Sequence, residues 1–405
     1  MSKSRPRQSF WPIRIVRAPL PDECMTSWLI RIARANAMKA QELVSLAGGR
    51  TKQLFWQDLD VLKGKPTLDH FSNLVRRPTE ELEAISLVGD LDRLTLRVQK
   101  SNRPFRWLLP RSAKQGRPTF RWLQFCPQCL QEDQTPYFRR QWRLAFCCIC
   151  ARHRRALRDE CVSCGEAFNF HLIDRGKPAL WEDLVLSTCA HCGHDARDER
   201  GTTIRPASPR LCRYQEALQA ACRDGWISTS ASGRYSWIYA EQLFDVLHRL
   251  IAQINLSDRV RTWMTTEVQR IAGRDVHAWQ LFGQPFVRWP LALRIDTFEW
   301  LARIFASWPR RFVAGARRYK AAYSDICGER ELLPYWFERP IDIALRRSWY
   351  VPSAEEKSNA IRCLLRCNIS PTYFAVRSML GLRSPNFKSL QNIDEARQVS
   401  WLQSE

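Results

Sequence analysis

Four closely spaced pairs of metal-ligand residues lie between residues 126 and 192, and they constrain the fold of this chain more than any other feature. Two residues separate the members of each pair, and the pairs in chain order are Cys126 and Cys129, Cys150 and His153, Cys161 and Cys164, and Cys189 and Cys192. This spacing lets both side chains of a tight turn reach one tetrahedral ion, and two such pairs complete a closed zinc shell. The sequence therefore predicts two Zn²⁺ ions.

The spacing leaves open which pairs share an ion. Sequential pairing joins the first pair with the second and the third with the fourth, whereas a crossed pairing joins the first with the third and the second with the fourth. Cys147 also stands two residues before Cys150, and His191 and His194 lie beside the last pair. We interpret Cys147 and Cys148 as buried thiols of a strand that leads into the second pair.

The expected role of both ions is structural. Four protein ligands leave no open position on the metal, whereas a catalytic zinc keeps one position for water or substrate. The N-terminal sequence is basic and lacks the apolar core of a signal peptide, which predicts a cytoplasmic protein. Because that compartment keeps thiols reduced, metal binding explains the 15 cysteines better than disulfides do.

The charge of the chain favours a polyanionic partner. The 405 residues include 63 Lys and Arg against 41 Asp and Glu, which gives a net charge of +22. DNA is the first candidate partner. No apolar run approaches the ~18 residues that a membrane span requires, so no membrane association is predicted.

Arginines and aromatic residues alternate around the cysteine pairs, a pattern typical of phosphate contacts and base stacking. A solvated basic face over a small core would give the same pattern, and Trp142 has the character of a core residue. The candidate DNA-binding residues in this region are Arg139, Arg140, Arg143, Arg152, Arg154 and Arg155.

The flanking segments carry helical periodicity. A helix through residues 26–38, capped by Asp22 or Ser27, and a short helix over 40–47 together resemble a helix-turn-helix, although any helical hairpin looks similar. Helices are also expected over 240–254, 297–308 and 355–366. A second helix-turn-helix candidate lies near 355–381, with Ser370 as the cap and Arg377 facing outward as a further DNA-binding candidate.

These patterns predict a mainly α fold with a small zinc-ribbon-like β module. The expected domains are an N-terminal helical or helix-turn-helix domain (1–120), a double zinc-binding module (121–200) and a helical C-terminal domain (201–405). No cluster of carboxylates suited to two Mg²⁺ ions, no G-x4-G-K-[ST] loop and no G-x-S-x-G turn is present in the sequence. The sequence therefore predicts no enzymatic activity, and a stand-alone zinc-containing transcription regulator is one function that fits.

Several of these segments together resemble TniQ proteins. The opening PLPDECMTSWLIRIARANAM is similar to theirs, and the matching residues are Pro21, Asp22, Glu23, Ser27, Trp28 and Leu29. FCPQCL, YFRRQWRLAFCCICARH and CVSCG resemble the family's zinc segment, and the sequential ligand pairing agrees with it. WLARIFASWPRRF, residues 300–312, resembles a later stretch of these proteins. The second pair is more basic than in the family, because Arg152, Arg154 and Arg155 surround it, and Cys148 is unusual there.

The resemblance covers residues 10–195 well, and the overall length and layout are similar to those of TniQ from mercury-resistance and integron-type transposons. It implies a non-enzymatic role in DNA transposition, in which the protein helps choose the target site. The resemblance further implies that the protein links target DNA to an AAA+ ATPase of the TniB/TnsC type, which recruits the transposase. A homodimer is also implied, because related proteins form dimers, and action at the bacterial nucleoid follows from the role.

Overall fold

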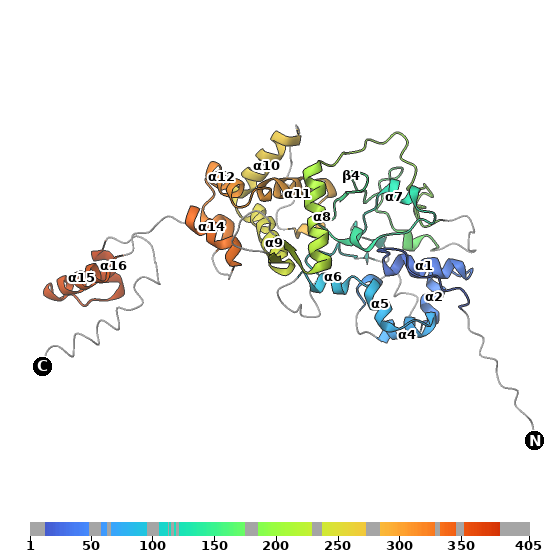
Figure 1. The fold of residues 1–405 in the computed structure, drawn as a ribbon, viewed down its shortest axis with the longest axis horizontal. Coiled ribbons are helices and arrows are strands. Elements are labelled where there is room, and N and C mark those ends of the chain that lie inside the picture. The colour runs from blue at the N-terminus through green and yellow to red at the C-terminus, as the bar shows by residue number, and fades with distance from the viewer. Residues whose placement is uncertain are drawn as a thin grey trace, which may run out of the picture. The chain divides into compact units, whose positions relative to one another are not determined.

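The computed structural model describes a mainly helical chain with short two-stranded antiparallel sheets (Figure 1). The described residues are 13–47, 58–62, 66–94, 105–111, 113–114, 117–118, 121–174, 185–228, 237–272, 284–328, 333–345 and 352–380. The chain divides into two compact units, Met1–Leu345 and Arg346–Glu405. The predicted mainly α class with small β elements is confirmed, whereas the boundaries at residues 120 and 200 stay predictions.

The N-terminal part is built around one buried helix. In α1 (Met25–Ala35), every residue from Met25 to Ala33 is buried. The N-cap of α1 is Cys24, so the predicted cap at Asp22 or Ser27 is wrong, and the Ser27 hydroxyl instead donates a hydrogen bond to Glu23. The following elements are α2 (Ala40–Leu46), η1 (Leu59–Val61), α4 (Pro66–Val75), α5 (Thr79–Ile85) and α6 (Val88–Asp92). The pair α1 and α2 packs together, and its DNA-binding role stays a prediction.

The region of the cysteine pairs consists of short elements joined by turns. They are β1 (Ala113–Lys114), β2 (Arg117–Pro118), α7 (Pro127–Glu132), η2 (Arg140–Arg143), β3 (Ile149–Cys150), β4 (Arg155–Ala156) and η3 (Phe170–Leu172). Pro127 occupies the first turn of α7, where its missing N–H costs no helical hydrogen bond. Strands β3 and β4 pair in antiparallel fashion, and the turn between them carries residues 151–154.

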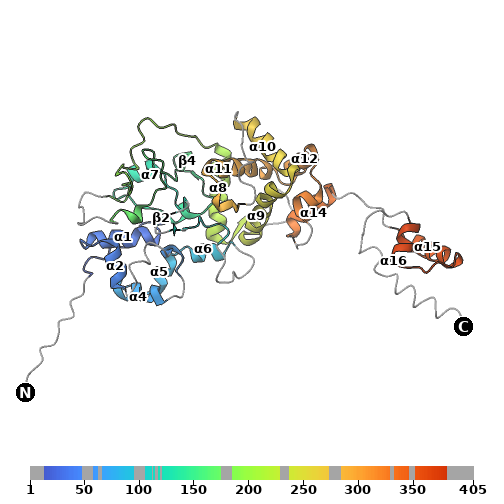
Figure 2. The same ribbon diagram turned by 180° about the vertical axis from the view of Figure 1, so that it is seen from behind.

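Longer helices follow in the first unit. They are α8 (Pro209–Asp224), α9 (Ala240–Leu256), α10 (Asp258–Ala272), α11 (Leu291–Phe305), α12 (Arg310–Arg318), α13 (Tyr323–Cys327) and α14 (Tyr335–Leu345), with η5 (Phe286–Arg288) before α11. A hairpin of β5 (Trp226–Ser228) and β6 (Trp237–Tyr239) connects α8 to α9. Helix α8 lies between the cysteine-rich region and α9, α10 and α12 in both views (Figures 1 and 2).

One hydrophobic core runs through the described part of the first unit, from Ile13 to Ile341. Trp107 contacts Phe146 of the cysteine-rich region and Phe244 of α9, with ring centroids 6.1 and 5.3 Å apart. Gln215 of α8 accepts hydrogen bonds from the backbone N–H groups of Cys148 and Ile149 at 2.8 and 3.0 Å. These contacts fix the cysteine-rich region against α8 and α9, the helices that follow it in the sequence.

The second unit contains a helix pair, α15 (Ala354–Arg366) and α16 (Tyr373–Met379), which pack through Ala360, Leu364 and Val376. The N-cap of α16 is Thr372, whose side chain accepts a hydrogen bond from the N–H of Ala375, so the predicted cap at Ser370 is wrong. The predicted end of this helix at Gly381 lies outside the described residues. No helix in the described ranges is long and apolar enough to cross a bilayer.

Candidate metal centres and the arginines around them

The first centre gathers Cys126, Cys129, Cys150 and His153 where α7 begins and the β3–β4 hairpin turns. Nδ1 of His153 lies 3.3 Å from the Sγ atoms of Cys126 and Cys129 and 3.4 Å from that of Cys150. The Sγ atoms of Cys129 and Cys150 are 3.6 Å apart. The sequential grouping is therefore the one that the structure contains.

These distances match a tetrahedral metal shell. Zn–S bonds of about 2.3 Å and Zn–N bonds of about 2.0–2.1 Å separate two sulfurs by about 3.8 Å and a sulfur from a nitrogen by roughly 3.6 Å. Thiol–thiol hydrogen bonds, followed by burial, raise the pKa of Cys129, because Cys126 and Cys150 lie beside it. A divalent cation would relieve this competition among neighbouring thiols, so the group can hold a metal ion.

Glu132 is a functional residue that sequence reasoning missed. It is the last residue of α7, one turn after Cys129, and its two carboxylate oxygens lie 3.0 and 3.1 Å from Nε2 of His153. A carboxylate behind a metal-binding imidazole fixes the ring and its tautomer, so Nδ1 is left as the ligand atom. The i+3 spacing from Cys129 on a helix was the one sequence signal that could have indicated it.

The second centre gathers Cys161, Cys164, Cys189 and Cys192 from two similar turns. The Sγ atoms of Cys161 and Cys192 are 3.6 Å apart, and those of Cys164 and Cys189 are 3.9 Å apart. In each turn a glycine follows the second cysteine with positive φ, +72° at Gly165 and +80° at Gly193. The N–H of each glycine donates to the carbonyl of the first cysteine of its turn at 2.9 Å.

Comparison with known families gives independent support for the resemblance. Residues 14–157 match the model of the TniQ family. The match contains the buried helix α1 and the whole first centre and ends directly after β4. This segment of the chain is therefore similar to the TniQ family. No curated protein matches the chain.

Within residues 14–157, the other two cysteines beside the first centre lie outside its group of candidate ligands. Cys147 and Cys148 are buried, as predicted, but they lie before β3, so their predicted place in a strand is wrong. Neither belongs to a group of metal-ligand residues. Burial raises the pKa of Cys148 to about 11. Beside the second centre, Nε2 of His194 lies 3.0 Å from the backbone carbonyl of Asp198, outside the group of four ligand atoms.

Arg154 adopts a conformation that glycine holds in the second centre. It directly follows His153, as Gly165 and Gly193 follow the second cysteine of their turns, and its φ is +49°. A residue with a Cβ is less stable in this region by roughly 1–2 kcal/mol. The Arg154 side chain is exposed and makes no ion pair among the residues that the structure describes.

Arg143, the most buried of the arginines proposed for DNA, contributes to the core of residues 14–157. Its side chain is 0% exposed and forms ion pairs with Asp58, at 2.6 Å, and with Asp60. Its Nε donates to the carbonyl of Trp122 at 3.0 Å, and the guanidinium lies over the Trp122 ring. Although burial opposes the charge, the two carboxylates raise the pKa of Arg143. We therefore do not include Arg143 in a DNA-binding surface.

Three further candidates also have partners within the protein. Arg139 pairs with Asp133 at 2.8 Å and lies over the rings of Tyr137 and Trp142, and Trp142 is buried as predicted. Arg140 donates to the carbonyl of Ala84 at 2.7 Å and lies 3.3 Å from Asp22. Arg155 is buried and pairs with Glu199.

Two candidates near the first centre face solvent, and one lies in the second unit. The Arg152 side chain is 65% exposed and contacts Glu132 at 2.7 Å. Arg154 is exposed on the same turn. Arg377 lies in α16 and is partly buried.

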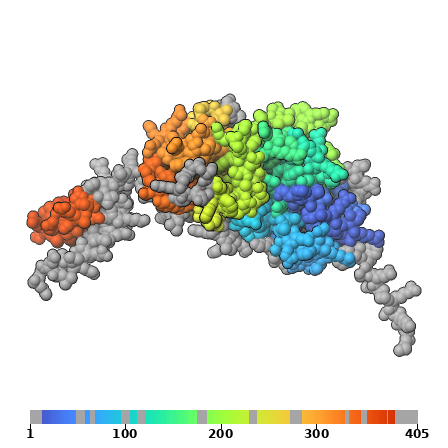
Figure 3. Space-filling model, viewed as in Figure 1, coloured from blue at the N-terminus to red at the C-terminus, as the bar shows by residue number. Residues whose placement is uncertain are grey.

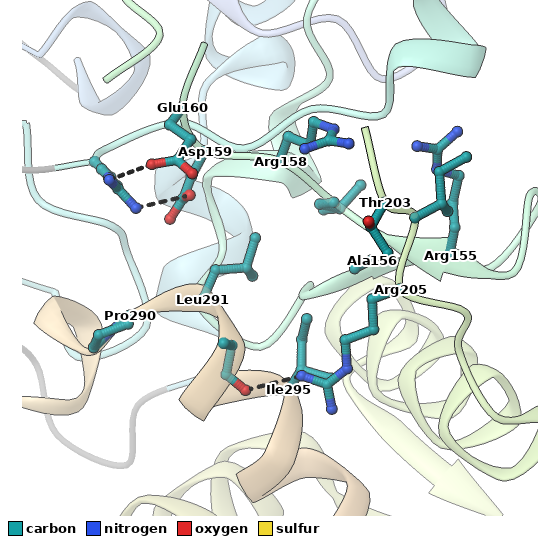
Figure 4. A pocket seen from close by; sticks show the side chains of 14 residues that line it. Arg155, Ala156, Arg158, Asp159, Glu160, Thr203, Arg205, Pro290, Leu291 and Ile295 are labelled. Carbon is teal, nitrogen blue, oxygen red and sulfur yellow. Dashed lines mark hydrogen bonds and ion pairs between the residues drawn. The ribbon is translucent and has the colours of Figure 1, made fainter. Parts of the chain in front are cut away.

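A cavity of about 250 Å³ lies between β4, the segment 203–205 and the start of α11 (Figure 4). Its arginines all have acidic partners: Arg121 with Asp159 and Glu160, Arg155 and Arg158 with Glu199, and Arg205 with Asp296. The cavity is therefore balanced in charge, and the Arg205–Asp296 pair joins the segment 203–205 to α11.

Proposed function

We propose that this protein is a non-enzymatic accessory protein of DNA transposition. It helps select the target site and links target DNA to an AAA+ ATPase of the TniB/TnsC type, which recruits the transposase. The observation that carries this proposal is the TniQ match over residues 14–157, which includes a complete first centre. The transposon type and a homodimer remain predictions from the resemblance, and the cytoplasmic location remains a prediction from the N-terminal sequence.

In this proposal both centres hold structural Zn²⁺. The bound ions supply cross-links between turns, and four protein ligands in each group leave no position for substrate. Glu132 orients His153, and the hydrogen bonds from Gly165 and Gly193 set the two turns of the second centre. The protein around the metals is then a rigid support for its surface side chains.

The DNA-facing side chains of the TniQ segment are Arg152 and Arg154. Both lie on the β3–β4 turn, which the first metal ion would hold in place, and both are exposed. An arginine on a rigid turn can contact a phosphate at a small entropic cost, because only its side chain and not the backbone of the turn has to be ordered. The helix pairs α1–α2 and α15–α16 would also suit a stand-alone transcription regulator, which is the second candidate function.

Pull-down of the ATPase encoded in the same transposon, with and without duplex DNA and ATP, tests the proposal. We expect weak, strongly salt-dependent DNA binding by the protein alone and tighter retention when the ATPase and ATP are present. Tight binding to one short operator without retention of the ATPase would favour the transcription regulator instead. Cleavage or strand transfer on a plasmid with Mg²⁺ and no other protein would contradict the non-enzymatic role.

A further inference from the structure

Helix α12 exposes basic residues along one face. Arg310, Arg311, Arg317 and Arg318 of the helix are exposed, as is Lys320 just after it. Residues seven apart lie two turns apart on the same face, so Arg310 aligns with Arg317 and Arg311 with Arg318. The opposite face is fixed in the core, because Phe312 and Ala316 are fully buried.

Neighbouring helices extend this positive charge. Helix α12 packs against α10 and α11, and α11 packs against α8. In the space-filling view the surfaces of α10 and α12 lie side by side, in yellow and orange (Figure 3). We call Arg270 of α10, Arg303 of α11 and the four exposed arginines of α12 the α12 basic surface.

The arginines of this surface are close enough to repel one another. Burial and then the charge of Arg270 lower the pKa of Arg303, and Arg210 and Arg311 act in the same direction. Glu267 opposes this effect, but its single carboxylate is shared between two arginines, because it lies 2.9 Å from Arg270 and 3.4 Å from Arg303.

The arginines of α12 itself lack acidic partners in the part of the chain that the structure describes. Arg310, Arg311 and Arg318 form no ion pair there, and Arg317 donates to the carbonyl of Ala344 at 3.1 Å. Unbalanced positive charge on a packed surface destabilises the protein until a polyanion neutralises it. The surface therefore suits a ligand with closely spaced negative charges.

The chemistry of the surface favours duplex DNA over a protein or a single strand. Ala314 is the one exposed apolar residue of α12, whereas a protein interface needs an apolar core with buried anchors. Single strands are held by aromatic platforms, and the exposed Trp226 and Trp237 lie on the β5–β6 hairpin instead. A duplex presents one negative charge per ~1.7 Å of its axis, so a helix of 9 residues, about 13 Å long, meets several phosphates.

We propose that the α12 basic surface contacts the backbone of duplex DNA without reading its sequence. This inference rests on the proposed function, because it adds a second DNA contact to that of Arg152 and Arg154. The two contacts are far apart in the sequence, and the second lies outside the segment that matches the TniQ family. Target DNA would thus be held by the helices that follow the metal centres as well as by the first centre.

The test is the salt dependence of duplex binding by the full-length protein with its metal ions bound. The variant carries Arg310→Gln, Arg311→Gln and Arg318→Gln, and its affinity for unrelated duplexes is measured by fluorescence anisotropy between about 50 and 200 mM salt. Each lost phosphate contact lowers the slope of log K against log salt by about 0.9, so we expect a decrease of about 2–3 for every duplex sequence. Zinc content and melting temperature should match those of the unmodified protein.

A control variant carries Arg93→Gln, Arg200→Gln and Arg223→Gln, which removes the same charge from exposed positions on other elements. We expect its slope to stay close to that of the unmodified protein. The inference would be overturned if both variants lost the same amount of slope, or if the α12 variant lost none. The proposed function would still stand in either case, provided that the unmodified protein binds DNA and retains the ATPase. Loss of the ATPase with unchanged DNA binding would also overturn the inference, because the surface would then serve a protein. Failure of the unmodified protein to bind any duplex at low salt would contradict both proposals.

Discussion

Arg154 combines two properties that oppose each other in a residue with a purely structural role. Its φ of +49° favours glycine, and the equivalent turns of the second centre do have glycine there. Its side chain is exposed and stabilises nothing by ion pairing within the described residues. An arginine kept at a strained position indicates a role that the arginine side chain itself performs.

We therefore expect Arg154→Gly to leave the stability of the protein unchanged or to raise it by up to about 1 kcal/mol, because the strain is relieved. The same change should weaken retention on duplex DNA at low salt, because one phosphate contact is lost. Thermal melting and anisotropy on the same samples check both effects, and Arg152→Gln is the control that removes charge without relieving strain. A clear loss of stability in Arg154→Gly would show that the side chain is structural.

Glu132 shows how one carboxylate can tune a metal site that it does not bind. It contacts Nε2 of His153 and also pairs with Arg152, so its charge acts on the ligand and on the exposed turn. Glu132→Gln keeps the size of the side chain and removes that charge. We expect metal affinity at the first centre to fall about 10- to 100-fold. Competition with a chromophoric chelator measures this loss, and the second centre in the same molecule, whose affinity should not change, is the control. An unchanged metal affinity at the first centre would contradict this role of Glu132.

Single residues also show how far the sequence could be interpreted. The grouping of the eight candidate ligands was predictable because two-residue spacing is a local property, and the structure gathers these residues in two groups of four. The burial of Arg143 was not predictable from the sequence, because its partners Asp58 and Asp60 lie more than 80 residues earlier in the chain. Local composition reports how basic a segment is, and only packing decides which of its arginines reach solvent.

At the scale of elements, α12 is oriented by a close approach to α10. A Cβ on Gly315 would lie 2.6 Å from Cε2 of Trp263, well inside van der Waals contact. The Trp263 ring cannot move aside easily, because it packs against Trp300 and Phe312 with ring centroids 5.2 and 5.3 Å away. The glycine thus lets α12 lie flat on α10 and turns its arginines outward.

Gly315→Ala should therefore destabilise the protein by about 1–3 kcal/mol through overpacking, although alanine is the better helix former. Gly89→Ala in α6 is the matched control, because a Cβ there meets nothing within 4 Å and should stabilise by up to about 1 kcal/mol. Denaturant unfolding of both variants measures the difference. Equal stabilisation by the two changes would show that α10 and α12 do not pack closely in solution.

The helices themselves were largely predictable from their apolar periodicity, as α1, α9, α11 and α15 show. Their ends were less so, because capping depends on which backbone groups the tertiary structure leaves unpaired. Thr372 rather than Ser370 caps α16, and Cys24 begins α1 without a side-chain cap. The α12 basic surface was not predicted from the sequence: four of its arginines belong to α12, but Arg270 and Arg303 come from separate helices that only the fold brings close to it.

At the scale of the whole first unit, the metal centres lie within a core that they share with helices before and after them in the sequence. Removing the metals should therefore affect more than the cysteine-rich turns. A structural zinc ion of the kind proposed for each centre contributes on the order of 10 kcal/mol or more, which is comparable with the total stability of a domain. We expect a strong chelator to abolish most of the helical circular dichroism of the first unit, with recovery on addition of Zn²⁺ but not Mg²⁺. Helical signal that persists after complete metal release would contradict this coupling.

Gln215 also bears on how the protein can be dissected. Residues 14–157 contain every candidate ligand of the first centre, yet Gln215, which accepts hydrogen bonds from the N–H groups of Cys148 and Ile149, lies beyond that range. A fragment cut at the limit of the TniQ match would leave those N–H groups unpaired and uncover apolar side chains that α8 and α9 now shield. The segment that matches the TniQ family is thus shorter than the smallest fragment of this polypeptide that we expect to fold on its own.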